Sequence, residues 1–311
     1  MQLSGVFLPV PTPFDPVEGE VTPVHFRENL RRWLGHGIAG IVVAGSTGEA
    51  PLLEEAEVVR LVEWARELVD GEQRLLVGTG AESTRAAVRR TRDAAAAGAD
   101  GVLVRAPSYY RPWMRPAVLR TYYETVADAS SVPVILYHVP QFVPVEMAPE
   151  FVAAVAQHPN VVGIKESSGD VKALGALLGA VPRGFGVLVG SGANLYAGLA
   201  IGAVGGIVGV GCLAPAEAVE IHSRFQAGDE AAAGRRQEQL APLHRTLVAG
   251  LGVPGIKYAL DLLGYAGGPP RPPLLPLSER DRTTVQRELT RAGLLRQERP
   301  STSSSSATPL S

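Results

Sequence analysis

Val161-Val162-Gly163-Ile164-Lys165 is an apolar run that ends on a lysine, and it is one of eight such runs in the chain. Apolar runs without alternating polar residues are typical of strands that are buried on both faces of a parallel sheet. Longer segments rich in Ala, Leu, Arg and Glu separate the runs. The pattern therefore predicts eight buried parallel strands, at residues 5–10, 38–44, 74–79, 100–106, 133–139, 161–166, 186–190 and 203–210.

The segments between these runs have the spacing of amphipathic helices. Thr22-Pro23 and Ser83 are typical helix starts, the first with a proline in the first turn and the second as an N-cap. Eight strand–helix alternations favour a closed (β/α)8 TIM barrel over an open doubly wound sheet. No G-x-G-x-x-G motif follows the first run, which argues against a dinucleotide-binding fold. The predicted helices are 22–36, 53–70, 83–97, 115–129 and 149–157, with further candidates at 171–178 and 194–200.

The chain divides into a barrel, a helical extension and a tail. We expect the (β/α)8 barrel over residues 1–214, and a C-terminal helical extension packed on it over residues 215–296. This extension includes predicted helices at 216–226 and 229–247. Residues 297–311 contain a Ser-Thr-Ser-Ser-Ser-Ser stretch and two prolines. Such a composition cannot bury enough apolar surface to order itself, so we predict a disordered Ser-rich tail.

Composition argues against several classes of protein. The 311 residues are 46% hydrophobic, with a formal net charge of −2 and a pI near 6.3, so nothing indicates a nucleic-acid or membrane partner. No residue between Arg183 and Glu217 is charged, but the glycines there fit a buried strand, helix and strand better than a membrane span. The single cysteine, Cys212, fits a reducing cytoplasm and a small apolar packing role. The N-terminal residues show no signal-peptide pattern, so we expect a cytoplasmic protein.

Lys165 is unusual for this chain, because only three of the 29 basic residues are lysines, the others being Lys172 and Lys257. Burying an unpaired ammonium group is costly. Lysine, unlike arginine, can lose its proton when it is buried and then act as an amine nucleophile. The alternative is an ordinary strand-end lysine whose charged group extends to solvent.

Other chemically suitable residues also stand at predicted strand ends, where TIM barrels carry their active sites. Gly45-Ser46-Thr47-Gly48-Glu49 follows the second strand, Ser108-Tyr109-Tyr110 follows the fourth, and Tyr137 ends the fifth. We expect them to face one mouth together with Lys165. There Lys165 could form an iminium with a ketone while Tyr137 shuttles protons. The small residues after the second strand could hold a carboxylate or a phosphate.

Each of these residues also has an ordinary structural role open to it. Tyr137 could be a packed strand tyrosine, and Gly45-Ser46-Thr47-Gly48 could be a tight turn. His138 should point to the opposite face of its strand by alternation, and we expect it to pack rather than to react. The six histidines share no motif and no metal-ligand spacing is visible, so neither a metal nor a cofactor is predicted.

Three motifs carry a family resemblance: Gly45-Ser46-Thr47-Gly48-Glu49, Tyr137-His138-Val139-Pro140 and Gly163-Ile164-Lys165-Glu166-Ser167-Ser168-Gly169-Asp170. Together they resemble the dihydrodipicolinate synthase/N-acetylneuraminate lyase superfamily, over roughly residues 3–296. The resemblance implies a class I pyruvate aldolase on a (β/α)8 barrel, with a 2-keto acid substrate and no cofactor. It also implies a homotetramer, built as a dimer of dimers.

The resemblance assigns roles to individual residues. Lys165 becomes the Schiff-base lysine, Tyr137 the proton-shuttling phenol, and Ser46 the hydroxyl that relays protons to Tyr137. Tyr109 matches a tyrosine that reaches a neighbouring subunit's site, with Tyr110 as the alternative after a slip of one residue. Thr47 and its amide are expected to hold the pyruvate carboxylate. The full set of expected substrate-binding residues is Thr47, Gly48, Ser167, Phe142 and Val208.

Departures from the family pattern narrow the reaction. Phe142 stands where dihydrodipicolinate synthases have an arginine that binds the aldehyde substrate's carboxylate, and a phenyl ring cannot replace a guanidinium. Ala193 stands where sialic acid lyases have a carboxylate. The likeness is closest to 4-hydroxy-2-oxoglutarate aldolase, which implies cleavage of a 4-hydroxy-2-keto acid into pyruvate and an aldehyde such as glyoxylate. The segments that carry this likeness are 108–111, 157–163, 203–206, 253–257 and 264–269.

Three alternatives are open at this point. One is a condensation of pyruvate with another aldehyde, as in dihydrodipicolinate synthases or hydratase-aldolases, and Phe142 would suit an apolar or aromatic aldehyde. The second is a non-catalytic barrel that binds a keto acid, although both Lys165 and Tyr137 are present. The third is a barrel that binds a sugar phosphate, for which Gly190-Ser191-Gly192 and Gly209-Val210-Gly211 supply glycine-rich loops.

Overall fold

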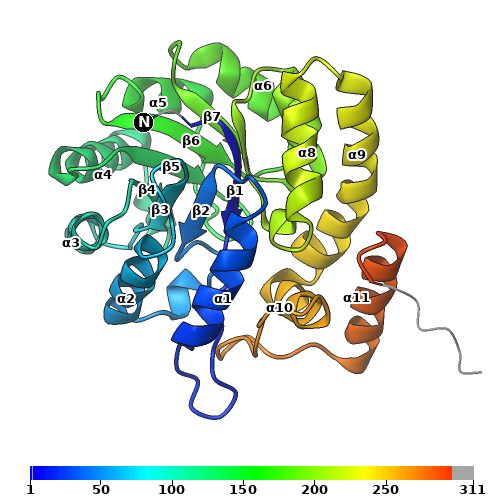
Figure 1. Cartoon of the computed structure of the whole chain (residues 1–311). Helices are drawn as coiled ribbons and strands as arrows, with labels where there is room; N and C mark the ends of the chain where they lie inside the picture. Colours follow the sequence, from blue (N-terminus) through cyan, green and yellow to red (C-terminus); the bar gives the residue numbers. More distant parts are fainter. Residues whose placement is uncertain (2, 296–311) are drawn as a thin grey trace, which may run out of the picture.

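The computed structural model describes Met1 and residues 3–295, which fold around a closed barrel of eight parallel strands (Figure 1). The strands follow chain order around the barrel, and β8 pairs with β1 to close it. This confirms the predicted (β/α)8 TIM barrel. The strands are β1 (Gly5–Pro9), β2 (Gly40–Val43), β3 (Arg74–Gly78), β4 (Gly101–Arg105), β5 (Val134–His138), β6 (Val161–Glu166), β7 (Gly186–Val189) and β8 (Gly205–Ile207).

Helices cover the outside of the barrel, so the strands are buried on both faces. Ile41, Leu76 and Val102 on three successive strands are fully buried, as expected for near-continuous apolar runs. Ser83 caps its helix, because its side-chain oxygen accepts a hydrogen bond of 3.1 Å from the Ala86 amide. The helices are α1 (Pro23–Leu34), α2 (Glu55–Arg66), α3 (Thr84–Ala96), α4 (Pro116–Ala129), α5 (Pro149–Val155), α6 (Val171–Ala180), α7 (Leu195–Ala200) and α8 (Pro215–Gln226).

Every strand except β6 is shorter than the apolar run that predicted it, and the difference is largest for β8 and β2. Within residues 203–210, only β8 is extended, and Gly209–Cys212 form a 3-10 turn (η4). In the run 38–44, the strand ends at Val43 because Ala44 has a φ of 53°. The apolar composition continues past the strands because the turns at this end of the barrel are buried too, as the full burial of Val210 illustrates.

The pairing of β5 with β6 contains a register shift. Val134 pairs with Val161, but Ile135 pairs with Gly163, so one residue of β6 is passed over. Beyond this shift, Tyr137 lies directly opposite Lys165. The irregularity therefore sets which side chains meet at the end of these two strands.

The chain after the barrel is helical. It runs through α9 (Glu230–Leu243), a π-helical segment His244–Gly250 (η5), α10 (Gly252–Leu262) and α11 (Glu279–Arg291). The proposed boundary at residue 214 stays a prediction, because α8 packs against both β1 and α9. Figure 1 shows α10 beside α1, and Asn29 of α1 exchanges two hydrogen bonds, of 2.8 and 2.9 Å, with the backbone of Ala266. The predicted disordered tail, 297–311, lies outside the described residues.

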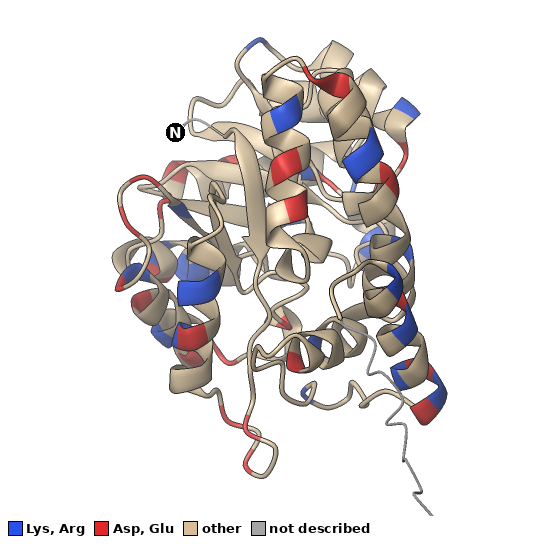
Figure 2. Ribbon diagram, turned by 45° about the vertical axis from the view of Figure 1, so that its right-hand side comes forward, with Lys and Arg blue, Asp and Glu red and all other residues tan. Residues whose placement is uncertain are grey.

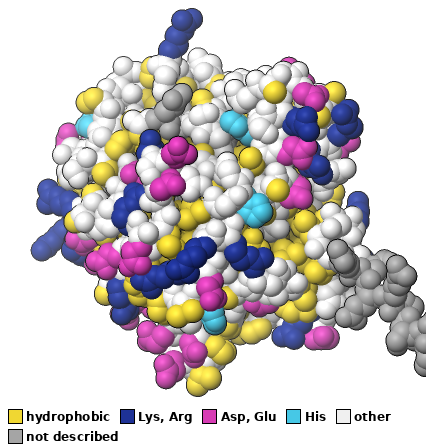
Figure 3. Space-filling model, in the orientation of Figure 1, with side chains coloured by type: hydrophobic (Ala, Val, Ile, Leu, Met, Phe, Trp, Pro, Cys, Tyr) yellow, Lys and Arg dark blue, Asp and Glu magenta, His cyan; other side chains and the backbone are white. Residues whose placement is uncertain are grey.

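Most charged residues lie on the helices and loops that surround the barrel (Figure 2). On the face seen in Figure 3, basic and acidic side chains are interspersed among hydrophobic ones. Within residues 3–295, no helix is long and apolar enough to cross a membrane.

Candidate active site

Lys165 and Tyr137 lie side by side where β6 and β5 end. The Lys165 Nζ atom is 4.3 Å from the centre of the Tyr137 ring, and the two residues are only 5% and 7% exposed. Among the described residues, no carboxylate pairs with Lys165. The buried carboxylates of Glu166 and Glu49 pair instead with His138 and Lys257. A buried lysine without a counter-ion, next to a phenol, is suited to act as an amine nucleophile.

Ser46 extends this pair into a chain of polar atoms. Its Oγ atom lies 3.2 Å from the Tyr137 hydroxyl, and either oxygen can be the donor. Ser46 belongs to the turn between β2 and a 3-10 segment, Ala50–Leu52 (η1). Closure of the barrel thus brings together residues that are 91 positions apart. The arrangement allows a proton to move between the two hydroxyls.

Thr47 and Gly48 continue the same turn toward β8. A side-chain carbon on Gly209 would lie 3.6 Å from Thr47 Oγ1, so Thr47 faces the residue that follows Val208. Val208 itself is fully buried. At Gly48, a side-chain carbon would come within 2.9 Å of the Val10 carbonyl oxygen, so only glycine fits there without a shift of the backbone.

Ser167 follows Lys165 by two residues, directly after β6, and lies beside Gly190, the residue after β7. Its hydroxyl is buried and has no hydrogen-bond partner among the described residues. It lies against Gly190, where any side chain would collide with it. A buried hydroxyl without a partner is available to a polar ligand. The predicted substrate-binding role of Ser167 stays a prediction.

His138 and Glu166 form a pair next to Tyr137 and Lys165 along the two strands. Each is one residue beyond Tyr137 or Lys165, and His138 Nδ1 lies 3.1 Å from Glu166 Oε1. Glu166 also accepts a 2.8 Å hydrogen bond from the Ser168 amide. The alternation of strand side chains places this pair on the outer face of the barrel, as predicted for His138.

Two other reactive residue types are held in inert forms. Cys212 is fully buried, and burial raises the pKa of its thiol, which donates to the Pro9 carbonyl at 3.3 Å. Burial lowers the pKa of His244 to about 4, so its imidazole is neutral near pH 7. Its Nε2 atom lies 3.3 Å from the Ser191 hydroxyl, which follows β7.

Within one copy of the chain, Tyr109 and Phe142 are exposed and are not buried beside Lys165. They are 79% and 69% exposed. The ring centres of Tyr109 and Tyr110 are 5.1 Å apart, and those of Tyr110 and Trp113 are 6.0 Å apart, both in edge-to-face arrangements. These three rings therefore form an exposed aromatic cluster. A role for Tyr109 in a neighbouring subunit's site stays a prediction.

Arg105 and Glu82 also lie near the site, but they were not among the candidate site residues named from the sequence. Arg105 ends β4 opposite Tyr137, and its guanidinium donates to Glu82 Oε1 at 2.8 Å. Glu82 also accepts from the Ser108 and Tyr109 amides, at 2.8 and 2.9 Å, so it fixes the start of the loop that carries the aromatic cluster. Burial alone would raise the pKa of Glu82, but these amides and Arg105 hold it below its usual range. The signal for Arg105 was present, because it is a charged residue that ends an apolar run, like Lys165.

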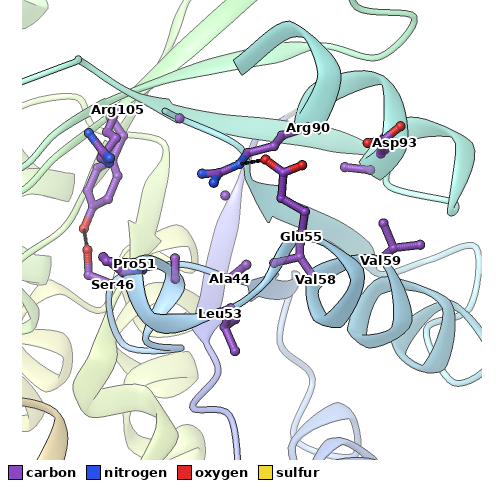
Figure 4. Close-up of a pocket in the computed structure, with 16 residues that line it drawn as sticks. Ala44, Ser46, Pro51, Leu53, Glu55, Val58, Val59, Arg90, Asp93 and Arg105 are labelled. Atoms are coloured by element: carbon purple, nitrogen blue, oxygen red, sulfur yellow. Dashed lines mark hydrogen bonds and ion pairs between the residues drawn. The ribbon is translucent and has the colours of Figure 1, made fainter. Parts of the chain in front are cut away.

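A cleft leads outward from the mouth (Figure 4). Ser46 and Tyr137 line this cleft together with Glu55 of α2 and Arg90 of α3. Figure 4 shows Ser46 on one side of it, away from the Glu55 and Arg90 pair. The Arg90 Nε atom donates to Glu55 Oε1 at 3.0 Å, and hydrogen bonds from Arg89 and Arg90 lower the pKa of the Glu55 carboxyl. Lys165 does not line this cleft, so of the Lys165, Tyr137 and Ser46 group only Ser46 and Tyr137 border it. As for metals, the described part of the chain has no group of three or more His, Cys, Asp and Glu side chains that could hold an ion.

Comparison with known proteins defines the family. The model of the dihydrodipicolinate synthetase family matches residues 2–292. A 4-hydroxy-tetrahydrodipicolinate synthase of Methanopyrus kandleri is 34% identical, over 94% of this chain and 98% of the relative. An uncharacterized DapA-like lyase of Halobacterium salinarum is 36% identical, over 94% and 95%. Among solved structures, the chloride-inhibited dihydrodipicolinate synthase of Acinetobacter baumannii, complexed with pyruvate, has a TM-score of 0.90 at 30% identity, over 94% of this chain and 99% of that one.

The chain therefore belongs to the dihydrodipicolinate synthetase family and is a lyase of the class I pyruvate aldolase superfamily. The relatives named here are synthases and a DapA-like lyase. None of these names is 4-hydroxy-2-oxoglutarate aldolase, so the closer likeness to that enzyme, expected from the sequence, is not confirmed.

Proposed function

We propose that this protein joins pyruvate to an aldehyde, and splits the resulting 4-hydroxy-2-keto acid, through a Schiff base on Lys165. One observation carries the proposal: the buried Lys165 Nζ lies 4.3 Å from the ring centre of Tyr137, whose hydroxyl is 3.2 Å from Ser46. An amine, a phenol and a second hydroxyl are thereby arranged in sequence. Pyruvate in the complex of the Acinetobacter relative supports pyruvate as the keto acid.

The chemistry follows from these groups. The Lys165 amine adds to the keto carbon of pyruvate, and loss of water from the carbinolamine gives an iminium. The iminium draws electrons from the adjacent methyl carbon, which loses a proton to give an enamine. The enamine carbon then adds to the aldehyde carbonyl carbon, and hydrolysis releases the product. Tyr137 moves the protons at the carbinolamine and carbon–carbon bond steps, and Ser46 relays them. Thr47 and its amide hold the pyruvate carboxylate.

Phe142 bears on the choice of aldehyde. Its phenyl ring is exposed and cannot form the charge-assisted pair with a carboxylate that an arginine forms at this position in dihydrodipicolinate synthases. We infer that the aldehyde is recognised without such a pair, as in a hydratase-aldolase-like condensation or in cleavage of a 4-hydroxy-2-keto acid such as 4-hydroxy-2-oxoglutarate. The names of the relatives favour a second candidate, the condensation of pyruvate with L-aspartate semialdehyde.

Borohydride reduction in the presence of pyruvate tests the Schiff base. We expect one stable adduct, on Lys165, when the peptides are mapped by mass spectrometry. Lys172 is exposed, and Lys257 is buried and bonded to three oxygen atoms, so neither should react. An adduct on Lys172 or Lys257 alone, or none at all, would refute the proposed chemistry.

Two assays on the same preparation separate the aldehydes. Pyruvate released from a panel of 4-hydroxy-2-keto acids reports cleavage. A coupled reductase assay with pyruvate and L-aspartate semialdehyde reports the synthase reaction. Efficient turnover in the second assay would establish the second candidate in place of the first.

Assembly and location are further proposals. The exposed cluster of Tyr109, Tyr110 and Trp113 is suited to contact with a second copy, in keeping with the predicted dimer of dimers. Light scattering coupled to size-exclusion chromatography measures the number of copies directly. The expected cytoplasmic location stays a prediction.

A further inference from the structure

Two non-glycine residues with positive φ flank the Gly45–Gly48 turn. Ala44 has a φ of 53° and Glu49 a φ of 60°, and within the described residues no other non-glycine residue adopts this left-handed conformation. Such residues persist where the surrounding structure over-determines them. The contacts of Glu49 therefore bear on how firmly the proposed carboxylate-binding turn is held.

The Glu49 carboxylate is bonded to the C-terminal extension. Its Oε1 atom accepts a 2.7 Å hydrogen bond from Lys257 Nζ of α10, and the two side chains are 0% and 1% exposed. Its Oε2 atom accepts a 2.8 Å hydrogen bond from the backbone amide of Arg271. Burial lowers the pKa of Lys257, but the charge of Glu49 acts against this shift. A fully buried ion pair thus joins the turn to residues more than 200 positions away.

Lys257 reaches the turn by a second route as well. Its ammonium donates to the carbonyl oxygens of Thr12 and Pro269, at 2.8 and 2.7 Å, so all three of its protons have acceptors. The Thr12 hydroxyl in turn donates to the Gly48 carbonyl at 2.8 Å. Both residues after Thr47 are therefore connected to one ammonium group.

Arg271 holds the chain beyond the turn. Its guanidinium donates to the Leu52 carbonyl at 2.9 Å and to both carboxylate oxygens of Glu57 at 2.7 Å. Lys257 Nζ and Arg271 Cζ lie 4.4 and 4.1 Å from the centre of the Phe14 ring. The segment from Gly48 to Glu57 is thus fastened to the C-terminal extension at several points.

We propose that Lys257 is a positioning residue for the keto acid: with Glu49, it holds the Ser46-Thr47-Gly48 turn in the shape that binds the pyruvate carboxylate. This inference rests on the proposed function. Lys257 does not touch the substrate, because its ammonium is enclosed by Glu49, Thr12 and Pro269. The C-terminal extension is thereby part of the support of the active site.

If the pair of Lys257 and Glu49 were purely structural, removing it would change the stability of the fold and not the binding of pyruvate. Buried ion pairs are weak evidence for stability, because replacing both partners with uncharged residues of similar shape is often neutral. Removing only one partner leaves an unpaired buried charge and destabilises the fold. The informative variant is therefore the double substitution Lys257→Met with Glu49→Gln, which removes both charges and keeps an acceptor for the Arg271 amide.

The assay is the exchange of pyruvate methyl protons for deuterium in D2O, followed by NMR over a range of pyruvate concentrations. Exchange requires the iminium and the enamine but no aldehyde, so it reports the half-saturating pyruvate concentration and a maximal rate. In the double variant we expect the half-saturating concentration to rise about tenfold, as for one lost contact to a charged group, with a smaller change in the maximal rate. The thermal midpoint should stay close to that of the wild type. The matched control is Lys172→Met, which removes the exposed lysine of α6 and should change neither quantity.

A double variant that exchanges pyruvate with the wild-type half-saturating concentration would overturn the inference. If the double variant does not fold, Thr12→Val decides, because it removes the hydroxyl that donates to the Gly48 carbonyl and so breaks the route from Lys257 through residue 12, while the Thr12 carbonyl still accepts from Lys257. An unchanged half-saturating concentration in Thr12→Val would then overturn it, and a raised one would support it. If the wild-type protein neither exchanges pyruvate nor traps it with borohydride, the proposed function itself fails. Exchange by the wild type with no effect in the variants removes only the role of Lys257.

Discussion

Replacing Tyr137 with phenylalanine removes one oxygen from the wall of the mouth and leaves the buried ring in place. Among the described residues, the lost oxygen makes one hydrogen bond, the 3.2 Å contact with the Ser46 hydroxyl. Losing this hydrogen bond should lower the free energy of unfolding by about 0.5–1.5 kcal/mol. Each kcal/mol lowers the thermal midpoint by roughly 2–4 °C. A general acid–base group contributes about 10²–10⁴-fold in rate, which corresponds to roughly 2.7–5.5 kcal/mol of activation free energy. The loss of rate should therefore far exceed the loss of stability.

Deuterium exchange into the pyruvate methyl group measures the rate, and thermal unfolding measures the stability of the same sample. Tyr123→Phe is the matched control, because Tyr123 is a fully buried tyrosine of α4 whose hydroxyl, within the described residues, donates a hydrogen bond to Met147 Sδ alone, at 3.8 Å. It should lower the thermal midpoint slightly and leave exchange unchanged. Near-wild-type exchange by Tyr137→Phe, with an unchanged midpoint, would remove Tyr137 from the mechanism.

Three further predictions concern specificity, metals and pH. Phe142→Arg should raise activity toward L-aspartate semialdehyde in the coupled reductase assay, by about 10- to 150-fold for a new charge-assisted contact of roughly 1.5–3 kcal/mol; no gain would show that this position does not select the aldehyde. EDTA should leave pyruvate exchange intact, because the iminium itself supplies the electron sink; a complete loss that a divalent cation restores would instead indicate a metal-dependent aldolase. The hydrogen bonds from Arg271 lower the pKa of Glu57 below its ordinary value of 4.5, so its ion pair should stabilise the fold above that pH and lose this effect as pH falls through the lowered pKa. The thermal midpoint of Glu57→Gln should therefore lie below that of the wild type at pH 7 and converge with it in acid, and a constant gap across this range would contradict the assignment.

The eight strands could be predicted because burial on both faces favours apolar residues along most of a parallel strand. The same constraint made Lys165 visible, since a lysine at the end of such a run stands out in a chain that otherwise uses arginine. It could not show where each strand stops. Val210 is as apolar as a strand residue because it is equally buried, yet it lies in a turn.

Lys165 and Lys257 show what the sequence by itself determined and what it left to the tertiary structure. The sequence identified both as rare lysines but placed only Lys165 at the end of an apolar run, and both are buried, at 5% and 1% exposure. Only the fold distinguishes them: Lys165 lies over Tyr137 without a counter-ion, whereas Lys257 is paired with Glu49, 208 residues earlier. The first contact depends on the register shift at Val134 and Ile135, and the second on how α10 packs against the closed barrel. Local patterns report whether a side chain is buried, but the partner it meets there depends on chain closure over hundreds of residues.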